Sequence, residues 1–232
     1  MSNDSTNIMT VPLSAELLRQ FGNVALFASK DRARPILTCL HIEQIEQGDQ
    51  RGVAIAATDS YALAWAEVFP TEPADAPSGM LEVKLSVDAV KTIATMVKGS
   101  GLERHPEAFA LDLAECGWSL VRRDGGGTLA SGETPAGQFP AWRSPIPGAF
   151  PRGPETPRLT VDMNLFGRAA KLKLSPGAES KKSTVRTWVS PDENKPSVWY
   201  HVTADVSGLI MPIRVGAEVA NAFPSPSAKV AQ

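Results

Sequence analysis

Long apolar runs, cysteine, histidine and an excess of charge of either sign are all scarce in this 232-residue chain. No run approaches the roughly 20 apolar residues that a membrane-spanning helix needs. Residues 1–7 lack the basic start and apolar core of a secretory leader, so we expect a cytoplasmic protein. A formal net charge of −2 argues against holding nucleic acid by bulk positive charge alone.

Groupings typical of metal and redox sites are also absent from the sequence. The two cysteines, Cys39 and Cys116, cannot form a disulfide framework and lack a zinc-like spacing, which favours buried reduced thiols. The histidines His41, His105 and His201 stand apart from one another and from the cysteines. A structural histidine is the favoured interpretation for each, and we predict no metal and no cofactor.

Two further features could suggest chemistry but have simpler interpretations. The three glycines at 125–127 are not followed by a lysine and a helix, so they predict a hairpin turn rather than a phosphate-binding loop. Asp59 follows a buried strand without a second carboxylate or a base at a useful spacing, which favours a turn-forming role. We therefore predict that the protein is not an enzyme. A small hydrolase on an unrelated α+β fold is the disfavoured alternative.

What the chain does contain is one order of elements, strand, helix and three strands, repeated three times. The first passage has a strand at 8–13, a helix at 14–28 and strands at 36–45, 53–58 and 63–69. The second has a strand at 80–85, a helix at 86–98 and strands at 108–114, 118–122 and 128–132. The third has a strand at 158–162, a helix at 163–174 and strands at 185–189, 198–203 and 209–215. Ser14 and Ser86 are the expected N-caps of the first two helices.

These passages predict an α+β protein of repeated β-α-β-β-β units, with helices on one face of antiparallel sheets. We expect one domain within residues 1–150, formed by the units at 8–70 and 80–134 and followed by a proline-rich linker at 135–157. A half-size domain of one unit is expected at 151–215. The Ala-, Ser- and Pro-rich residues 216–232 are expected to be a disordered tail.

Positive charge is concentrated in the helical segments. Residues 14–34, 86–104 and 162–182 carry net charges of +2, +1 and +3, so the remainder of the chain carries −8. A protein with this division can present one basic face to phosphate groups while its other surfaces repel them. Solvated helix faces that happen to carry Lys and Arg remain an equal alternative.

Three short segments are the most specific signal in the sequence. They are Ala-Thr-Asp-Ser-Tyr-Ala-Leu-Ala at 57–64, Phe-Pro-Ala-Trp at 139–142 and Leu-Ile-Met-Pro-Ile-Arg at 209–214. Together with Arg-Pro-Ile-Leu at 34–37, they resemble, in the same order, segments of the bacterial DNA polymerase sliding-clamp (beta subunit) family. The family patterns are an Ala-Thr-Asp-Gly-Tyr-Arg-Leu-Ala turn, a Phe-Pro-Asp-Tyr linker and a Met-Pro-Met-Arg end.

The resemblance implies a pocket for the clamp-binding peptide of polymerases, with one wall from the first two units and one from the third. Carried over position by position, the pocket comprises Leu37, Thr58, Ser60, Tyr61, Ala62, Leu63, Pro140, Leu209 and Met211. Ser60 replaces the family's Gly and Ala62 its Arg, so the pocket mouth is less polar here. The second helix opens with Val87 and Asp88, where the family usually has basic residues.

The resemblance also implies a ring, because clamps of this kind close with about twelve units. The family's first domain has no counterpart here and its last domain is reduced to one unit. Three units per chain would close with four chains through head-to-tail contacts, so a tetramer is favoured over a trimer. An open monomer that only shares the pocket stays open as an alternative. The compaction suggests a viral or mobile-element origin.

The function implied is a DNA sliding clamp that encircles duplex DNA without sequence preference and tethers a replicative polymerase. A separate clamp loader, which also binds through the pocket, would be the component that uses ATP. The phosphate-contacting residues expected in the pore are Arg19, Arg34, Lys91, Lys98, Arg168, Lys171 and Lys173. The alternative is a clamp-like adaptor or decoy that binds clamp-interacting peptides, or the host clamp, without encircling DNA.

Overall fold

The structure, a computed structural model, describes residues 8–78, 82–100, 105–146, 163–175, 184–189 and 195–212. The strand predicted at 158–162, the later part of the linker and the tail at 216–232 lie outside these ranges. Within the described ranges, no helix is long and apolar enough to cross a membrane.

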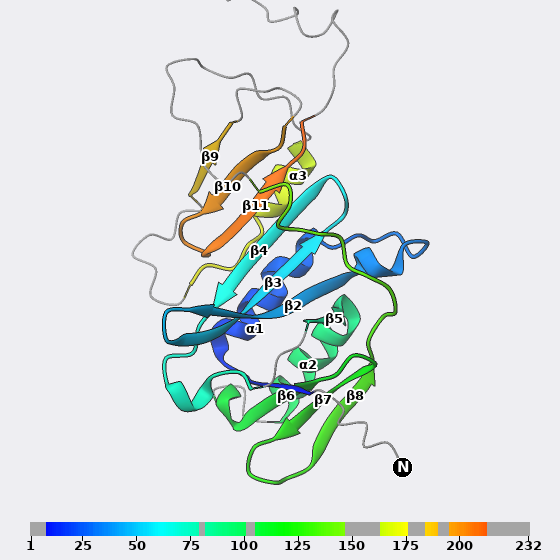
Figure 1. The fold of residues 1–232 in the computed structure, drawn as a ribbon, viewed down its shortest axis with the longest axis vertical. Helices are drawn as coiled ribbons and strands as arrows, with labels where there is room; N and C mark the ends of the chain where they lie inside the picture. The colour runs from blue at the N-terminus through cyan, green and yellow to red at the C-terminus, as the bar shows by residue number, and fades with distance from the viewer. Residues whose placement is uncertain are drawn as a thin grey trace, which may run out of the picture.

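The strands of a seven-stranded antiparallel sheet follow one another along the long axis of the molecule (Figure 1). Its spatial order is β5-β2-β3-β4-β11-β10-β9. The bounds are β2 (Cys39–Gln47), β3 (Gln50–Thr58), β4 (Ala62–Val68), β5 (Glu82–Ser86), β9 (Val185–Trp188), β10 (Ser197–His201) and β11 (Val206–Ile210). Strands from all three predicted passages therefore share one sheet.

The second sheet has four strands in the order β1-β6-β7-β8. Its strands are β1 (Met9–Pro12), β6 (Phe109–Leu113), β7 (Gly117–Arg122) and β8 (Thr128–Glu133). The two sheets exchange strands, because β1 of the first passage pairs with β6 of the second and β5 of the second pairs with β2 of the first. This exchange ties the first two passages into one body.

Each passage contributes one three-stranded meander, as the repeated pattern predicts. The meanders are β2-β3-β4, β6-β7-β8 and β9-β10-β11, all with antiparallel pairing. The glycine run between β7 and β8 forms the predicted hairpin turn, in which Gly125 and Gly127 adopt φ values of +84° and +82°. Left-handed values of this kind strain residues that carry a Cβ.

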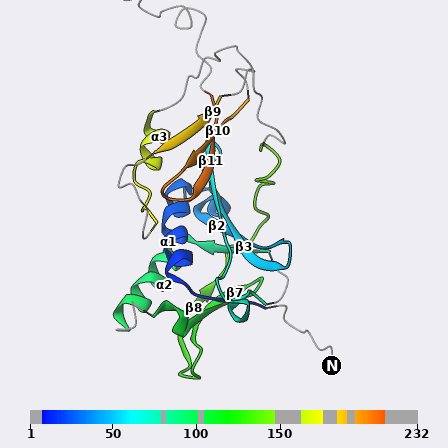
Figure 2. The same ribbon diagram turned by 90° about the vertical axis from the view of Figure 1, so that its left-hand side faces the viewer.

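The helices α1 (Ala15–Val24), α2 (Val87–Gly99) and α3 (Met163–Ala169) lie on the same side of the sheets (Figure 2). Ser14 and Ser86 cap α1 and α2 as predicted, since their hydroxyls accept hydrogen bonds from the backbone N–H groups of Leu17 and Ala89 at 3.0 Å. The buried stripes of α1 and α2 pack against strands of both sheets and complete the main core. They are Leu17, Phe21 and Val24 on α1 and Val90, Ile93 and Val97 on α2.

Several predicted boundaries were wrong, and the first helix, predicted to end at residue 28, ends at Val24. Residues 35–38 form a 3-10 helix and not the start of a strand, because Pro35 fixes φ and has no N–H to donate to a ladder. The last strand, β11, begins at Val206, directly after the turn residue Asp205 at φ +53°, and ends at Ile210. The helix predicted at 163–174 ends at Ala169.

Candidate functional site

The central feature of the site is the pairing of β4 with β11. Leu63 lies opposite Leu209 and Ala62 opposite Ile210 in the ladder. The pairing continues past the strand ends, where the Met211 N–H donates to the Tyr61 carbonyl at 3.0 Å. Two of the three signal segments are therefore hydrogen-bonded to each other. The paired strands come from the first and third meanders, and the second meander contributes no strand to the junction. The wall predicted from the first two units is therefore formed, at the level of strands, by the first unit.

Local hydrogen bonds fix the turn that precedes β4. One Asp59 carboxylate oxygen accepts from the N–H groups of Tyr61 and Ala62, both at 2.9 Å, which confirms the turn-forming role. The Thr58 hydroxyl donates to the Ala62 carbonyl at 2.8 Å and accepts from the Ser60 N–H at 3.1 Å. Ser60 itself adopts φ +81°, the conformation for which the family's glycine is suited.

The second signal segment, at 139–142, lies on the side of the large sheet away from the helices (Figure 2). Phe139 stacks on His41 with a centroid distance of 4.9 Å, and Trp142 lies 6.0 Å from Trp65. The Arg143 guanidinium sits 4.1 Å above the Trp142 ring. These aromatic contacts hold the linker against the sheet.

One buried apolar cluster joins all three segments. It contains Leu63 from the first, Phe139 and Trp142 from the second and Leu209 from the third. The convergence that the resemblance implies is therefore present in the packing. Not every predicted pocket residue is accessible, however, because Leu37, Ala62, Leu63 and Leu209 are buried and Thr58 nearly so.

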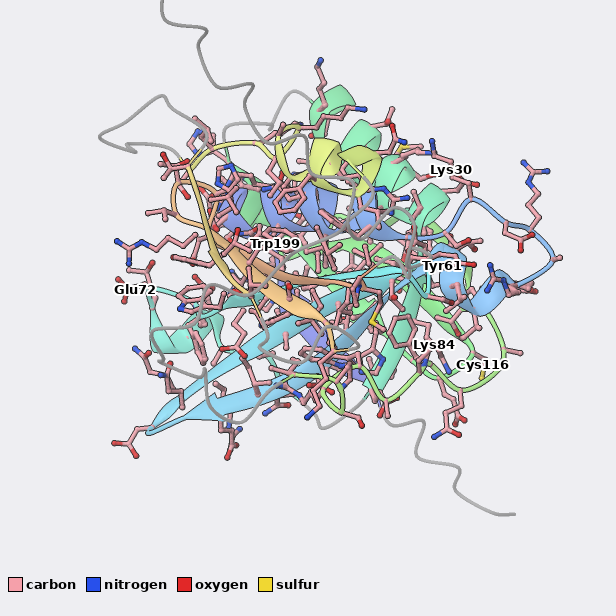
Figure 3. The ribbon with its side chains drawn as sticks, turned by 90° about the horizontal axis from the view of Figure 1, so that it is seen from above. Lys30, Tyr61, Glu72, Lys84, Cys116 and Trp199 are labelled. Carbon is pink, nitrogen blue, oxygen red and sulfur yellow. The ribbon has the colours of Figure 1, made fainter. Side chains whose placement is uncertain are left out.

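The accessible members are Ser60, Tyr61, Pro140 and Met211. Ser60, Tyr61 and Met211 lie together at the end of the β4–β11 pairing, and we call them the Tyr61–Met211 patch. Tyr61 is 65% exposed and Met211 38% exposed. Figure 3 shows Tyr61 beside the loop that carries Arg34, whose guanidinium reaches the Ser60 hydroxyl at 3.3 Å. Arg34 thus lies beside the patch, and it also pairs with Asp31.

A cavity of about 220 Å³ lies elsewhere, at the start of α1. Core residues including Val11, Leu13 and Val53 line it, and Glu72 and Asp75 lie at its wall. It contains none of the predicted pocket residues. A shallow peptide-binding surface need not enclose a cavity, and the three segments pack together away from this one.

Arg19 was predicted to face solvent and contact phosphate, but it is buried. It is 9% exposed, and its guanidinium donates to the carbonyls of Lys173 and Ala204 at 2.7 and 2.8 Å and pairs with Glu16. The neighbouring Gln20 also donates to the Ala204 carbonyl, at 3.0 Å. Arg19 anchors α1 to the third passage and is unavailable to phosphate. The only sequence signal for this contact is that Arg19, Gln20 and Asn23 lie on one face of α1.

Arg168 is also held within the molecule. Its guanidinium lies 2.6 Å from the second carboxylate oxygen of Asp59, and both side chains are largely buried. This ion pair links α3 to the turn beside the Tyr61–Met211 patch. We therefore assign Arg168, like Arg19, to the junction rather than to a DNA-facing surface.

The remaining predicted cations are exposed on the helix side. Lys91 and Lys98 lie on α2, and Lys91 pairs with Asp88 at 2.9 Å while keeping most of its surface in solvent. Lys171 and Lys173 follow α3 and are exposed. These four lysines are the accessible remainder of the expected basic face.

The cysteines and histidines do not cluster into a metal or catalytic site in the part of the chain that the structure describes. Cys39 is buried, and desolvation raises the pKa of its thiol. Cys116 is exposed in the turn between β6 and β7, so the prediction of a buried thiol was wrong there. His41 and His201 are buried and hydrogen-bonded, while His105 is exposed. In the described part of the chain, no three His, Cys, Asp or Glu side chains are grouped to hold a metal ion.

No protein-family model and no curated protein matches the chain by sequence. Solved structures do match its fold. The beta sliding clamp of Caulobacter crescentus aligns with a TM-score of 0.59 and 18% identity, over 93% of this chain and 67% of the clamp. The H. pylori beta clamp aligns with a TM-score of 0.62 and 13% identity, over 93% and 68% of the two chains.

The DNA polymerase III beta chain of Streptococcus pneumoniae gives a TM-score of 0.62 at 15% identity, over 93% of this chain and 66% of that one. The chain has the bacterial sliding-clamp fold. This confirms the predicted fold class and, at the level of structure, the resemblance drawn from the three segments. The chain spans about two thirds of the length of the clamps it matches.

Proposed function

We propose that this protein is a DNA sliding clamp that encircles duplex DNA as a homo-oligomeric ring and tethers a replicative polymerase through a peptide-binding pocket. The observation that carries the proposal is the β4–β11 junction, where the three signal segments share one apolar cluster within a clamp fold. The clamp fold supports the scaffold part of the proposal, and the shared apolar cluster supports a peptide-binding surface at the junction.

The Tyr61–Met211 patch has the composition of a peptide-binding surface. The exposed Tyr61 and Met211 lie two residues along the ladder from the buried cross-strand pair Leu63 and Leu209. Apolar anchors of this kind contribute most of the affinity in peptide recognition, and methionine adapts to partners of different shape. The expected ligand is the clamp-binding peptide of a polymerase or of a clamp loader.

DNA would pass along the helix side of the sheets, facing Lys91, Lys98, Lys171 and Lys173. Because a closed ring holds DNA topologically, each phosphate contact can be weak and independent of sequence. This is compatible with a chain whose net charge is −2. We propose that the ring contains four chains, and that a separate loader opens it.

The pocket is tested with Tyr61→Ala and Met211→Ala. We expect each substitution to weaken binding of a synthetic peptide that copies the clamp-binding tail of a bacterial replicative polymerase by roughly tenfold, about 1.4 kcal/mol. Fluorescence anisotropy measures the affinity. Leu63 is left unchanged because it is buried in the junction, where truncation would destabilise the fold.

Met96→Ala is the matched control, since Met96 is 42% exposed on α2, far from the junction in sequence. It should bind the peptide like the wild type. Unchanged affinity in both patch variants would show that the pocket assignment is wrong, whether or not the protein forms rings.

A further inference from the structure

The short helix α3 supports the β4–β11 junction from the helix side, beside the start of β4 and the end of β11 (Figure 1). Its buried side chains share one cluster with side chains of the two paired strands; the cluster contains Leu165 and Ala169 of α3, Ala62 and Ala64 of β4 and Ile210 of β11. Leu63 and Leu209 belong to the cluster on the opposite face. The strands that end at the Tyr61–Met211 patch are therefore packed on both faces.

The Asp59 carboxylate is shared between the turn that carries the patch and α3. One oxygen accepts hydrogen bonds from the N–H groups of Tyr61 and Ala62, both at 2.9 Å. The other oxygen lies 2.6 Å from Nη1 of Arg168. One carboxylate therefore joins α3, in the third passage, to the backbone of the patch in the first.

This ion pair is shielded from water, which makes it stronger than an ion pair on the surface. The Asp59 side chain is only 12% exposed, and Nη1 of Arg168 is inaccessible to solvent. Nη1 has no aligned hydrogen bond in the described ranges, so the Asp59 carboxylate is its counter-charge there. Attraction between opposite charges rises as water is excluded. Arg168 therefore fixes the orientation of the carboxylate that shapes the turn.

The turn depends on such support because its backbone is strained. Ser60 has φ +81°, and a residue with a Cβ keeps this conformation only where its surroundings impose it. The carbonyl of the next residue, Tyr61, accepts the N–H of Met211. A loosened turn would therefore displace Tyr61 and Met211 together, and these are the two apolar anchors of the patch.

We propose that Arg168 is a positioning residue for the peptide-binding patch, and that it acts through the Asp59 carboxylate without touching the peptide. The inference rests on the proposed function and adds a charged side chain of α3 to the parts that build the site. Anchors that are held in place before binding lose less conformational freedom when the peptide binds. Removing the Arg168 charge should therefore weaken peptide binding although Tyr61 and Met211 are both still present.

A double-mutant cycle tests whether Arg168 acts through Asp59. Arg168→Met keeps an apolar stem but removes the charge, and Asp59→Asn keeps an oxygen for the N–H groups of Tyr61 and Ala62 but removes the ion pair. We expect each substitution to weaken binding of the synthetic polymerase-tail peptide by about fivefold. The double variant should bind no more weakly than either single variant, because all three lack the same contact.

A spectroscopic measurement follows the patch without any peptide. The chain contains two tyrosines, Tyr61 and Tyr200, so labelling with 3-fluorotyrosine gives two fluorine resonances, which Tyr61→Phe assigns. Arg168→Met and Asp59→Asn should each shift or broaden the Tyr61 resonance. Tyr200, whose hydroxyl donates to Asp205 on the neighbouring turn, should keep its resonance and serves as the internal reference.

Arg123→Met is the matched control, because Arg123 forms a partly buried ion pair with Asp75 at 2.7 Å away from the junction. It should leave peptide affinity and the Tyr61 resonance unchanged, and circular dichroism checks that every variant is folded. An unchanged Tyr61 resonance in Arg168→Met overturns the proposal, and so do losses of affinity that add in the double variant. If the wild type does not bind the peptide, the proposed pocket is wrong, and the fluorine spectra alone decide whether Arg168 positions Tyr61.

Discussion

Ser60 keeps the backbone conformation of the clamp-family turn but replaces the glycine of the family pattern. It occupies a position with φ +81°, where the family pattern has glycine, and its hydroxyl accepts a hydrogen bond from Arg34. A residue with a Cβ pays about 1–2 kcal/mol in this conformation. The turn is nevertheless kept, because Thr58 and Asp59 over-determine it with four hydrogen bonds.

We expect Ser60→Gly to raise the free energy of unfolding by about 1 kcal/mol, since relief of the left-handed strain exceeds the added flexibility of the unfolded chain. Urea denaturation measures the change. Ser144→Gly is the control at an exposed residue that is not in the left-handed region, and it should not stabilise. Equal effects of the two substitutions would contradict the account of the turn.

His201 gives a prediction for pH. It is fully buried, and its Nδ1 accepts a hydrogen bond from the Ala204 N–H at 3.1 Å. Burial lowers the pKa of His201 from the ordinary value of 6.5, so the unfolded chain takes up a proton at a higher pH than the folded one. Its contribution to stability is therefore fully present above about pH 6.5 and is lost as the pH falls towards the lowered pKa.

The measurement is the free energy of unfolding at pH 7.5 and pH 5.5. The wild type should lose more stability between these values than His201→Asn, whose side-chain oxygen can still accept from the Ala204 N–H. His105→Asn controls for removal of an exposed histidine. A His201→Asn variant with the full wild-type pH dependence would show that His201 is not responsible.

For single residues, the sequence predicted roles in turns and helix caps well, but it predicted the solvent exposure of charged side chains poorly. The turn at Asp59, the caps Ser14 and Ser86 and the glycine turn depend on neighbours within a few residues, so they could be recognised. The burial of Arg19 depends on carbonyls more than 150 residues away in the chain. No local pattern contains that information.

Among the elements, α1 and β11 tolerate added volume very differently. Nothing lies within 4 Å of a Cβ built on Gly22 in α1, whereas a Cβ on Gly208 in β11 would lie 2.2 Å from Trp199 and 2.5 Å from the Leu63 carbonyl. Gly208 thus allows the close approach on which the β4–β11 junction depends.

We expect Gly22→Ala to stabilise the protein by about 1 kcal/mol through helix propensity. Gly208→Ala should destabilise it by about 3 kcal/mol, because neither the indole nor the backbone carbonyl can move without loss of packing. Urea titrations of the two variants form an internal comparison. If Gly208→Ala were as stable as the wild type, the junction would be less closely packed than the structure shows.

Element order could be predicted because hydrophobic periodicity and turn residues are local. The sheets could not be, since each meander contains the same pattern whether it pairs within its own passage or with another. The exchange of β1 and β5 between sheets, and the β4–β11 junction, are choices among similar edges. The likeness of the three signal segments to the clamp family indicated that the third passage shares a pocket with the first two, but it did not indicate which strand edges would meet.

For the whole molecule, the sequence predicted the fold more completely than it predicted the surface needed for the proposed function. The three repeated passages and the three signal segments led to the clamp fold at 13–18% identity to clamps of known structure. The charge division predicted a basic helix face, but two of its expected members, Arg19 and Arg168, stabilise the junction instead. Assembly is the property on which the proposed function most depends.

The most direct test of that function is the molar mass of the protein in solution at micromolar concentration. The proposed ring predicts a particle of four chains, each of 24.7 kDa. A particle of two chains would contradict the ring of four. A particle of one chain would contradict any ring, and would favour an adaptor that binds peptides without encircling DNA.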